Sequence, residues 1–210
     1  MNETQNSIAA EDLDERTVEH EPIKQFRDWF DDALASGSRL PESMTLATAT
    51  KDGQPSARVV LLKDVDERGF VFYTNYRSAK AKELDENPRA ALVFYWLGLD
   101  RQVRVEGTVE RVSDEESDEY FKTRPRESQI GALASPQSEV IHSREVLEKN
   151  FRDLDELYRD RSIDRPAHWG GYRLKPERVE FWQNRASRLH DRILYEREAD
   201  GSWTISRLAP

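Results

Sequence analysis

Basic side chains gather in one stretch of the chain, residues 57–83, whose sequence is ARVVLLKDVDERGFVFYTNYRSAKAKE. Two apolar runs, 59–62 and 70–73, flank a polar turn that ends in glycine, which is the pattern of a β-hairpin. A helix that begins after Ser78 would offer free N–H groups and a positive dipole end to an anion. The stretch is either a site for a phosphorylated ligand or a solvated hairpin, and its cations include Arg58, Lys63, Arg77, Lys80 and Lys82.

Regular strand alternation does not place two of these cations together. Arg58 and Lys63 are five residues apart, so a continuous strand sends their side chains to opposite faces. Either a bulge intervenes between them, or the ligand meets the strand near its end.

Tyr120, Arg124 and Ser128 form a second candidate group because they are spaced four residues apart. On a continuous helix they would share one face, although Pro125 bends the backbone between them. A tyrosine, an arginine and a serine on one face can clamp a phosphate, and they can equally form a solvent-facing trio. Spacing alone favours the solvent-facing arrangement.

The run 188–192, with the sequence RLHDR, contains a third group. Strand alternation places Arg188, His190 and Arg192 on one face. Three polar or cationic side chains on one face are unsuited to a core. The face is therefore either solvated or lines a pocket in a barrel.

The hydrophobic pattern predicts a mainly β protein with peripheral helices, an α+β fold built on an antiparallel barrel. Strands are expected at 44–50, 56–64, 69–74, 89–97, 101–112, 169–174, 178–183, 189–197 and 203–208. Residues 1–21 are polar and aperiodic, and we expect a disordered or flexible arm. Residues 22–210 then form a single domain with helical insertions at about 114–160.

Composition excludes several classes of function. The chain has 210 residues and no Cys, so disulfides, thiolate chemistry and Cys-ligated metals are excluded. Its four His residues are scattered, which argues against a metal site, and its net charge of −9 argues against nucleic-acid binding. The N-terminus lacks a signal pattern, and no apolar run approaches the ~18 residues of a membrane helix. We therefore expect a soluble, cytoplasmic protein.

A series of motifs runs in order through the chain from about residue 22 to residue 210. They are RVVLLK, VFYTN, SAKA, RQVRVEG, YFKTRPRESQIGA, WGGYRL, VEFWQ, RLHDR and the terminal RLAP. With the Gln137–Ser138 pair, they resemble the pyridoxamine 5′-phosphate oxidase family of FMN-dependent enzymes in vitamin B6 metabolism. The resemblance implies an FMN-binding split β-barrel, and a homodimer with both flavins at the subunit interface.

The same resemblance implies a reaction and its sites. The reaction is oxidation of pyridoxamine or pyridoxine 5′-phosphate to pyridoxal 5′-phosphate by O2, with release of H2O2; the alternative is another split-barrel flavin reductase or FMN-binding protein. The implied substrate site is Lys63, Tyr120, Arg124, Ser128, Arg188 and His190, with Arg188 and His190 as the catalytic pair. The implied FMN site is Arg58, Val59, Val60, Leu61, Leu62, Lys63, Tyr73, Thr74, Ser78, Lys80, Gln102, Gln137, Ser138, Trp182 and Arg192.

Two departures from the family pattern concern charge. The family usually has an arginine directly before the lysine of the SxK segment, and here that residue is Ala79. Arg77 is a possible substitute, although its side chain would point differently. Some members also carry a basic N-terminal segment that covers the substrate, whereas here Arg16 is the only Lys or Arg before Lys24.

Overall fold

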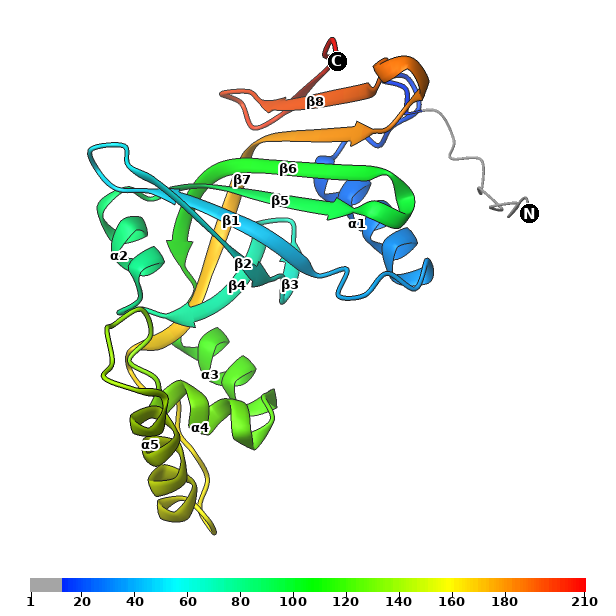
Figure 1. Ribbon diagram of the computed structural model, residues 1–210. Coiled ribbons are helices and arrows are strands. Elements are labelled where there is room, and N and C mark those ends of the chain that lie inside the picture. Colours follow the sequence, from blue (N-terminus) through cyan, green and yellow to red (C-terminus); the bar gives the residue numbers. More distant parts are fainter. Residues whose placement is uncertain (1–12) are drawn as a thin grey trace, which may run out of the picture.

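One antiparallel sheet forms the centre of the protein in the computed structural model, which describes residues 13–210 (Figure 1). Its path runs β2-β1-β5-β6-β7-β4-β3, and β8 adds to β7 and pairs in turn with β9. The strands are β1 (Ser43–Ala49), β2 (Pro55–Leu61), β3 (Asp64–Asp66), β4 (Gly69–Asn75), β5 (Arg89–Trp96), β6 (Arg101–Arg111), β7 (Trp169–Gln183), β8 (Asp191–Arg197) and β9 (Trp203–Arg207).

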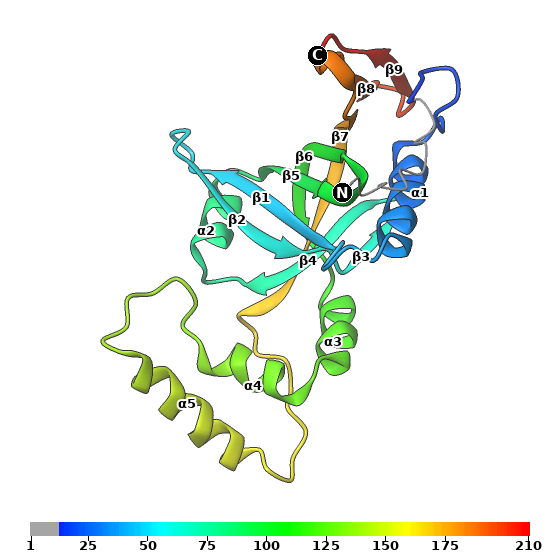
Figure 2. The same cartoon turned by 45° about the vertical axis from the view of Figure 1, so that its right-hand side comes forward.

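Helices lie around this curled sheet and confirm the expected mainly β fold with peripheral helices. Three of them cluster beyond the lower end of β7, far from β8 and β9 at its upper end (Figures 1 and 2). The helices are α1 (Pro22–Ala35), α2 (Ala79–Glu86), α3 (Asp114–Thr123), α4 (Arg126–Ala134) and α5 (Arg144–Leu157), with short 3-10 turns at Leu97–Leu99 and Ala186–Arg188.

The core lies between the concave face of the sheet and α1. Pro22 occupies the first turn of α1, where its missing N–H costs no hydrogen bond. The helix then buries Phe26 and Trp29; the Phe26 ring meets Phe70 and Phe94 at 4.8 Å each. In β6 the alternation expected from the sequence is observed, because every second residue from Val103 is buried.

The predicted hairpin between 59–62 and 70–73 is wrong. Residues 59–61 belong to β2, which pairs with β1, and the hairpin partner of β4 is the short strand β3. Because β2 ends at Leu61, Lys63 follows the end of the strand and is not bound by its alternation. The conflict between Arg58 and Lys63 is resolved by a strand end, with no bulge between them in β2.

The two strands expected at 169–174 and 178–183 are a single long strand, β7. Pro176 pairs with Gly107 but has no N–H to donate, and the β6–β7 register shifts beside it, between Glu106 and Gly107, where Glu177 is passed over. Gly107 is required there, since a Cβ at this position would lie 1.9 Å from the carbonyl oxygen of Lys175. β7 therefore runs without a break from the three-helix end of the molecule to the β8 end.

The chain before α1 differs in part from the flexible arm expected at 1–21. Residues 1–12 lie outside the described part of the chain, but residues 13–21 pack against the C-terminal strands. Leu13 is only 6% exposed, and Arg207 donates to Glu15 and to the Leu13 carbonyl. Tyr195 donates its hydroxyl to the Glu19 carbonyl at 2.7 Å. Aperiodic sequence did not reveal these anchors, which come from distant strands.

Arg173 fixes the position of α3 on the sheet. Its side chain is 2% exposed, and it donates to Asp66 and to Glu116 at 2.6 Å each. Glu116 lies on α3 one turn before Tyr120, so these two ion pairs join β7, the end of β3 and the helix that carries a candidate site residue.

We expect Arg173→Ala to lower the free energy of unfolding by about 3–5 kcal/mol, because it leaves two carboxylates without their buried partner. Urea unfolding at a fixed protein concentration measures the loss. Arg178→Ala, on the same strand but 44% exposed at its side chain, is the matched control. Equal losses in the two variants would contradict the role given to Arg173.

Candidate functional site

A cavity of about 460 Å3, here called the basic cavity, opens between the end of β2, β4, α2 and the α3–α4 corner. Tyr120, Arg124 and Ser128 all line it, so the helix break at Pro125 brings the trio to a cavity and the solvent-facing alternative is wrong. The remaining lining residues are Arg58, Val59, Val60, Leu61, Lys63, Tyr73, Thr74, Asn75, Lys80, Gly131, Ala132, Ser135, Gln137 and Trp169.

Lys80 is a buried cation in the wall of this cavity. The residue is 9% exposed, and its Nζ donates to Thr74 Oγ1, Ser78 Oγ and Gln137 Oε1 at 3.2, 3.4 and 3.1 Å. These acceptors are all neutral, and in the described part of the chain no carboxylate lies within ion-pair distance of Lys80. Burial, and then the nearby Arg58 charge, lower the pKa of Lys80. A buried ammonium held this way favours a bound anion.

Arg124 is a second cation in the same cavity, and it is half-buried. Its guanidinium lies 4.6 Å from the ring centre of Trp169, and its Nη1 is buried with no hydrogen-bond partner among the described residues. Burial lowers the pKa of Arg124, although the neighbouring Tyr120 opposes the shift. Buried donors are normally hydrogen-bonded, so an unpaired one indicates a missing acceptor.

Stacked aromatic rings form one wall of the cavity and support Arg124. The rings of Tyr73, Tyr120 and Trp169 are nearly parallel, and the Tyr73 centre lies 4.0 and 5.4 Å from the other two, which are 6.2 Å apart. Burial raises the pKa of Tyr73 to about 12, so its hydroxyl stays neutral. Flat apolar faces beside two unpaired cations suit an aromatic ligand with anionic groups. The cavity therefore fits FMN, and its two cations can bind more than one anionic group.

Five of the expected site residues lie elsewhere and are here called the distal group: Gln102, Trp182, Arg188, His190 and Arg192. Gln102, Trp182 and Arg192 are register partners in a row across β6, β7 and β8. Trp182 also meets the His190 ring at 4.7 Å between centres.

The expectation that Arg188, His190 and Arg192 share one strand face is wrong. β8 begins at Asp191, so only Arg192 belongs to the strand. Arg188 lies in a 3-10 turn with φ of 61°, and Ser187 before it is also left-handed with φ of 58°. This turn interrupts the strand alternation, so alternation does not predict the direction of the Arg188 side chain.

Polar partners hold the last two members of the distal group. His190 accepts at Nδ1 from the Arg185 backbone N–H at 3.1 Å. In its neutral form His190 then carries its proton on Nε2, which becomes a donor. Arg192 donates to Glu180 at 2.7 Å and to the Ala209 carbonyl at 2.8 Å, and these bonds fix its guanidinium beside the C-terminus.

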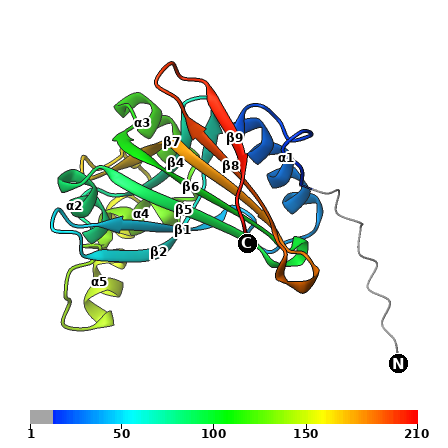
Figure 3. The same cartoon turned by 90° about the horizontal axis from the view of Figure 1, so that it is seen from above.

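One chain does not bring the basic cavity and the distal group together. Trp169 lines the cavity at the start of β7, and Trp182 lies thirteen residues further along the same strand. At about 3.3 Å per residue the strand between them spans up to ~40 Å. In Figure 3 α4 and α5 lie on the left, whereas the C-terminus and α1 lie on the right.

Some expected residues lie next to the cavity without lining it. Leu62 is buried in the core, and Ser138 follows Gln137 in a left-handed conformation with φ of 74°. Ser78 occupies the N-cap of α2, but its hydroxyl donates to the Asn75 carbonyl and does not cap the helix. Arg77 is exposed and outside the lining, so its substitution for the missing arginine stays a prediction.

Sequence reasoning missed several residues of this region, and three of them bear on the site. Trp169 and Asn75 line the cavity, and Glu83 pairs with Arg58 from α2 at 3.2 Å. Trp169 is part of the WGGYRL motif, and Glu83 lies one helical turn after Lys80. Both positions could therefore have been identified from the sequence.

A metal-holding cluster and a membrane-spanning helix are both absent from residues 13–210. No three His, Asp or Glu side chains in this part of the chain are grouped so that they could hold a metal ion. None of its helices is long and apolar enough to cross a membrane.

Comparisons with known proteins agree on one family. The model of the pyridoxamine 5′-phosphate oxidase family matches residues 30–158, and that of the pyridoxine 5′-phosphate oxidase C-terminal dimerisation region matches residues 169–210. Pyridoxine/pyridoxamine 5′-phosphate oxidase of Trichormus variabilis is 57% identical over 95% of this chain and 94% of its own. The protein of the same name in Rubrobacter xylanophilus is 58% identical over 94% and 91%.

Solved structures show the same fold. PhzG from Burkholderia lata, in complex with tetrahydrophenazine-1-carboxylic acid, has a TM-score of 0.91 and 32% identity, and covers 97% of this chain and 100% of its own. An FMN-binding protein from Nostoc punctiforme related to pyridoxamine 5′-phosphate oxidase has a TM-score of 0.71 at 19% identity, and covers 88% and 97%. The second likeness bears on the fold alone.

We expect Lys80→Met to raise the dissociation constant for FMN about tenfold or more, since it removes a charge-assisted contact of about 1.5–3 kcal/mol. Quenching of flavin fluorescence on titration of apo-protein measures the change. Lys82→Met, on the exposed face of the same helix, is the control. Unchanged affinity in Lys80→Met would remove this residue from the site.

Proposed function

We propose that this chain, which belongs to the pyridoxamine 5′-phosphate oxidase family and uses FMN as its cofactor, oxidises pyridoxamine and pyridoxine 5′-phosphate to pyridoxal 5′-phosphate. O2 is the acceptor and H2O2 is released; the amine substrate also takes up water and gives ammonia. The observation that carries the proposal is a pair of cations in one cavity: the buried Lys80, and the half-buried Arg124 whose Nη1 is buried without a partner among the described residues. FMN and a phosphorylated substrate bring one phosphate each.

Arg58, Thr74, Lys80 and Gln137 would hold the phosphate of FMN. Lys80 is already oriented by three hydrogen bonds, so little ordering is required when the anion binds. When bound, FMN supplies the two-electron redox chemistry, and the protein supplies placement and electrostatics. Asn75 and Gln137 border the same region of the cavity as polar groups.

Tyr120, Arg124 and Ser128 would hold the substrate phosphate, together with Lys63. The Nη1 of Arg124 gives this group a buried donor that has no acceptor among the described residues and is open to a ligand. Anchoring a phosphate distant from the reacting carbon uses binding energy to orient that carbon. This second anion-binding subsite favours a phosphorylated substrate over simple storage of FMN.

A homodimer would complete the site. The C-terminal match is to a dimerisation region, and it contains four of the five distal residues, all except Gln102. Exposed apolar side chains lie near both groups, with Val59 at 66% and Leu189 at 70%. Burying such side chains against a second copy would bring one chain's distal group to its partner's basic cavity.

Arg188 and His190 would then face the substrate from the partner chain. In the neutral form of His190 described above, Nε2–H donates a hydrogen bond and cannot accept a proton. Its role is therefore orientation of a substrate oxygen or amine, while a water takes the proton. Arg188 is exposed in one chain, and it would supply a cation over the substrate ring.

The competing function is that of another split-barrel flavin reductase or an FMN-binding protein. The PhzG neighbour holds a carboxylic acid, so an anionic substrate without phosphate is a specific rival. The purified protein with FMN should release peroxide and form pyridoxal phosphate on addition of pyridoxamine phosphate. Yellow protein that gives neither product would favour the rival.

We expect Arg124→Met to raise KM for pyridoxamine phosphate about tenfold or more, with FMN affinity preserved. The melting temperature should stay equal or rise, because the substitution removes an unpaired buried charge. Steady-state kinetics and thermal unfolding test the two parts. Arg126→Met, whose partner is Asp155 on α5, is the control. Loss of flavin in Arg124→Met would mean that Arg124 holds the cofactor.

We expect Arg188→Ala to keep its flavin and fold but to lose turnover on the order of 100-fold, because small errors in substrate placement are costly. Arg192→Ala should instead lose flavin. Flavin absorbance per subunit and peroxide production are measured on both variants. A colourless Arg188→Ala, or one with near-normal turnover, would show that the distal group is divided wrongly between cofactor and substrate.

A further inference from the structure

Arg58 lines the basic cavity, but its guanidinium is turned toward the sheet. Nη1 donates to the Leu46 carbonyl at 3.3 Å and to the Thr48 hydroxyl, and Nη2 donates to the Ser56 hydroxyl and to Glu83. None of the hydrogen bonds recorded among the described residues uses Nε of Arg58. The protein therefore holds both terminal nitrogens and leaves one edge of the group for a ligand.

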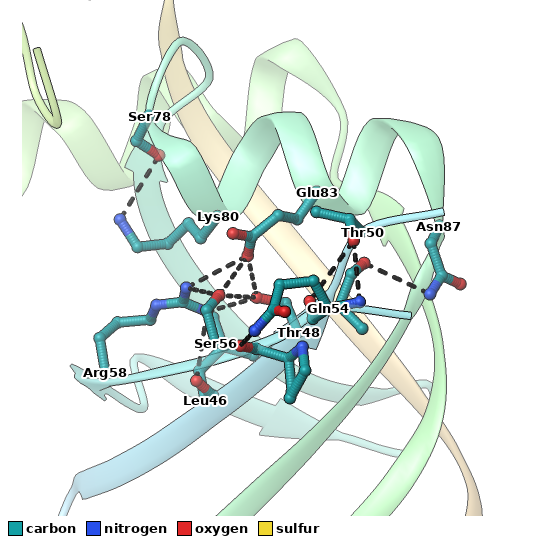
Figure 4. A network of polar contacts seen from close by, with 12 residues as sticks. Leu46, Thr48, Thr50, Gln54, Ser56, Arg58, Ser78, Lys80, Glu83 and Asn87 are labelled. Atoms are coloured by element: carbon teal, nitrogen blue, oxygen red, sulfur yellow. Dashed lines mark hydrogen bonds and ion pairs between the residues drawn. The ribbon is translucent and has the colours of Figure 1, made fainter. Parts of the chain in front are cut away.

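Glu83 is the hub of the polar network that holds this guanidinium (Figure 4). A single carboxylate oxygen, Oε2, accepts from Ser56 Oγ at 2.7 Å, from Arg58 Nη2 at 3.2 Å and from the Thr48 hydroxyl. Burial opposes ionisation, but these three donors together lower the pKa of Glu83 below its ordinary value. The carboxylate is thus charged at neutral pH and is 15% exposed.

The hub decides which way the two hydroxyls point. A hydroxyl has one proton, and Thr48 and Ser56 both give theirs to Glu83. Their lone pairs are then free to accept from Arg58, and both do so. Without the carboxylate, either hydroxyl can rotate its proton toward the guanidinium and repel it. Glu83 therefore controls three of the four contacts that fix Arg58.

Sequence positions explain why these groups meet. Thr48 and Ser56 are register partners in the β1–β2 hairpin, and Leu46 faces Arg58 one pair further along the same face. Helix α2 packs over this face and reaches it with Glu83. The same helix presents Lys80 to the cavity, one turn earlier.

We propose that Glu83 is a positioning residue, which holds Arg58 at the wall of the basic cavity beside Lys80 and so pre-organises the phosphate end of the FMN site. The assignment rests on the proposed place of the FMN phosphate. Glu83 itself does not line the cavity, and Arg58 stands between its carboxylate and the ligand. Glu83 touches neither substrate nor cofactor and acts through Arg58.

Two effects of removing Glu83 oppose each other. Loss of a negative charge near the phosphate favours FMN binding, whereas loss of the hub releases Arg58. Glu83→Gln removes the negative charge but keeps an oxygen that can accept hydrogen bonds. Glu83→Ala removes both the charge and the acceptor. We expect Glu83→Ala to raise the FMN dissociation constant about tenfold, and Glu83→Gln to stay within about threefold of wild type.

The experiment is titration of apo-protein with FMN, followed by flavin fluorescence, on wild type and both variants. Glu86→Ala removes a carboxylate from the same helix; Glu86 is exposed and makes no ion pair within residues 13–210. Riboflavin has the same ring system without the phosphate, so its binding should be equal in wild type and Glu83→Ala. In an Arg58→Ala background, Glu83→Ala should have no further effect on FMN, as a double-mutant cycle requires of coupled residues.

Three results would overturn the assignment: wild-type FMN affinity in Glu83→Ala, an equal loss for riboflavin, or an undiminished loss in the Arg58→Ala background. The last two would mean that Glu83 acts through the fold of α2. None of these depends on turnover. Wild-type protein that binds FMN tightly but does not oxidise pyridoxamine phosphate would overturn the proposed reaction, and the same titrations would still support or refute the role of Glu83.

Discussion

The desolvation of two cations, Lys80 and Arg124, is the constraint on which the rest of this structure depends. A buried charge without a counter-ion is costly, and a fold retains one only when other parts hold it in place. Lys80 is held by three neutral oxygens, and Arg124 lies over the face of Trp169. No carboxylate among the described residues pairs with either of them, and on the proposed function two anionic groups complete the cavity, one from FMN and one from the phosphorylated substrate.

The sheet places the basic cavity and the distal group at opposite ends of one strand. β7 begins at the cavity with Trp169 and ends at the distal group with Trp182, and Gly107 allows the strand to pass Pro176 without ending. Such a long strand separates two groups of residues that, on the proposed function, one substrate would contact. Closure by a second copy, related by two-fold symmetry, is the simplest arrangement that unites them. On this account the dimer is part of the active site and not only a source of stability.

The sequence predicted most elements, because the alternation in β6, Pro22 at the start of α1 and the helix break at Pro125 are local signals. The pairing of strands was less accessible. The sequence of residues 59–73 does not indicate that β2 pairs with β1. The left-handed turn at Ser187 and Arg188 contains no glycine, so the sequence does not predict it. For the site, motifs located both groups of residues, but spacing alone favoured the wrong environment for Arg124. The role of Glu83 depends on a contact across 25 residues and required the structure.

The most direct test of this account is a mixed dimer. Arg124→Ala and Arg188→Ala subunits carrying different tags are co-expressed, and the dimer that carries both tags is isolated. Each homodimer has two defective sites, whereas the mixed dimer has one site with both defects and one with neither. The account predicts that turnover of pyridoxamine phosphate in the mixed dimer returns to about half of the wild-type value per dimer. A mixed dimer as inactive as the two homodimers would contradict a site shared between subunits.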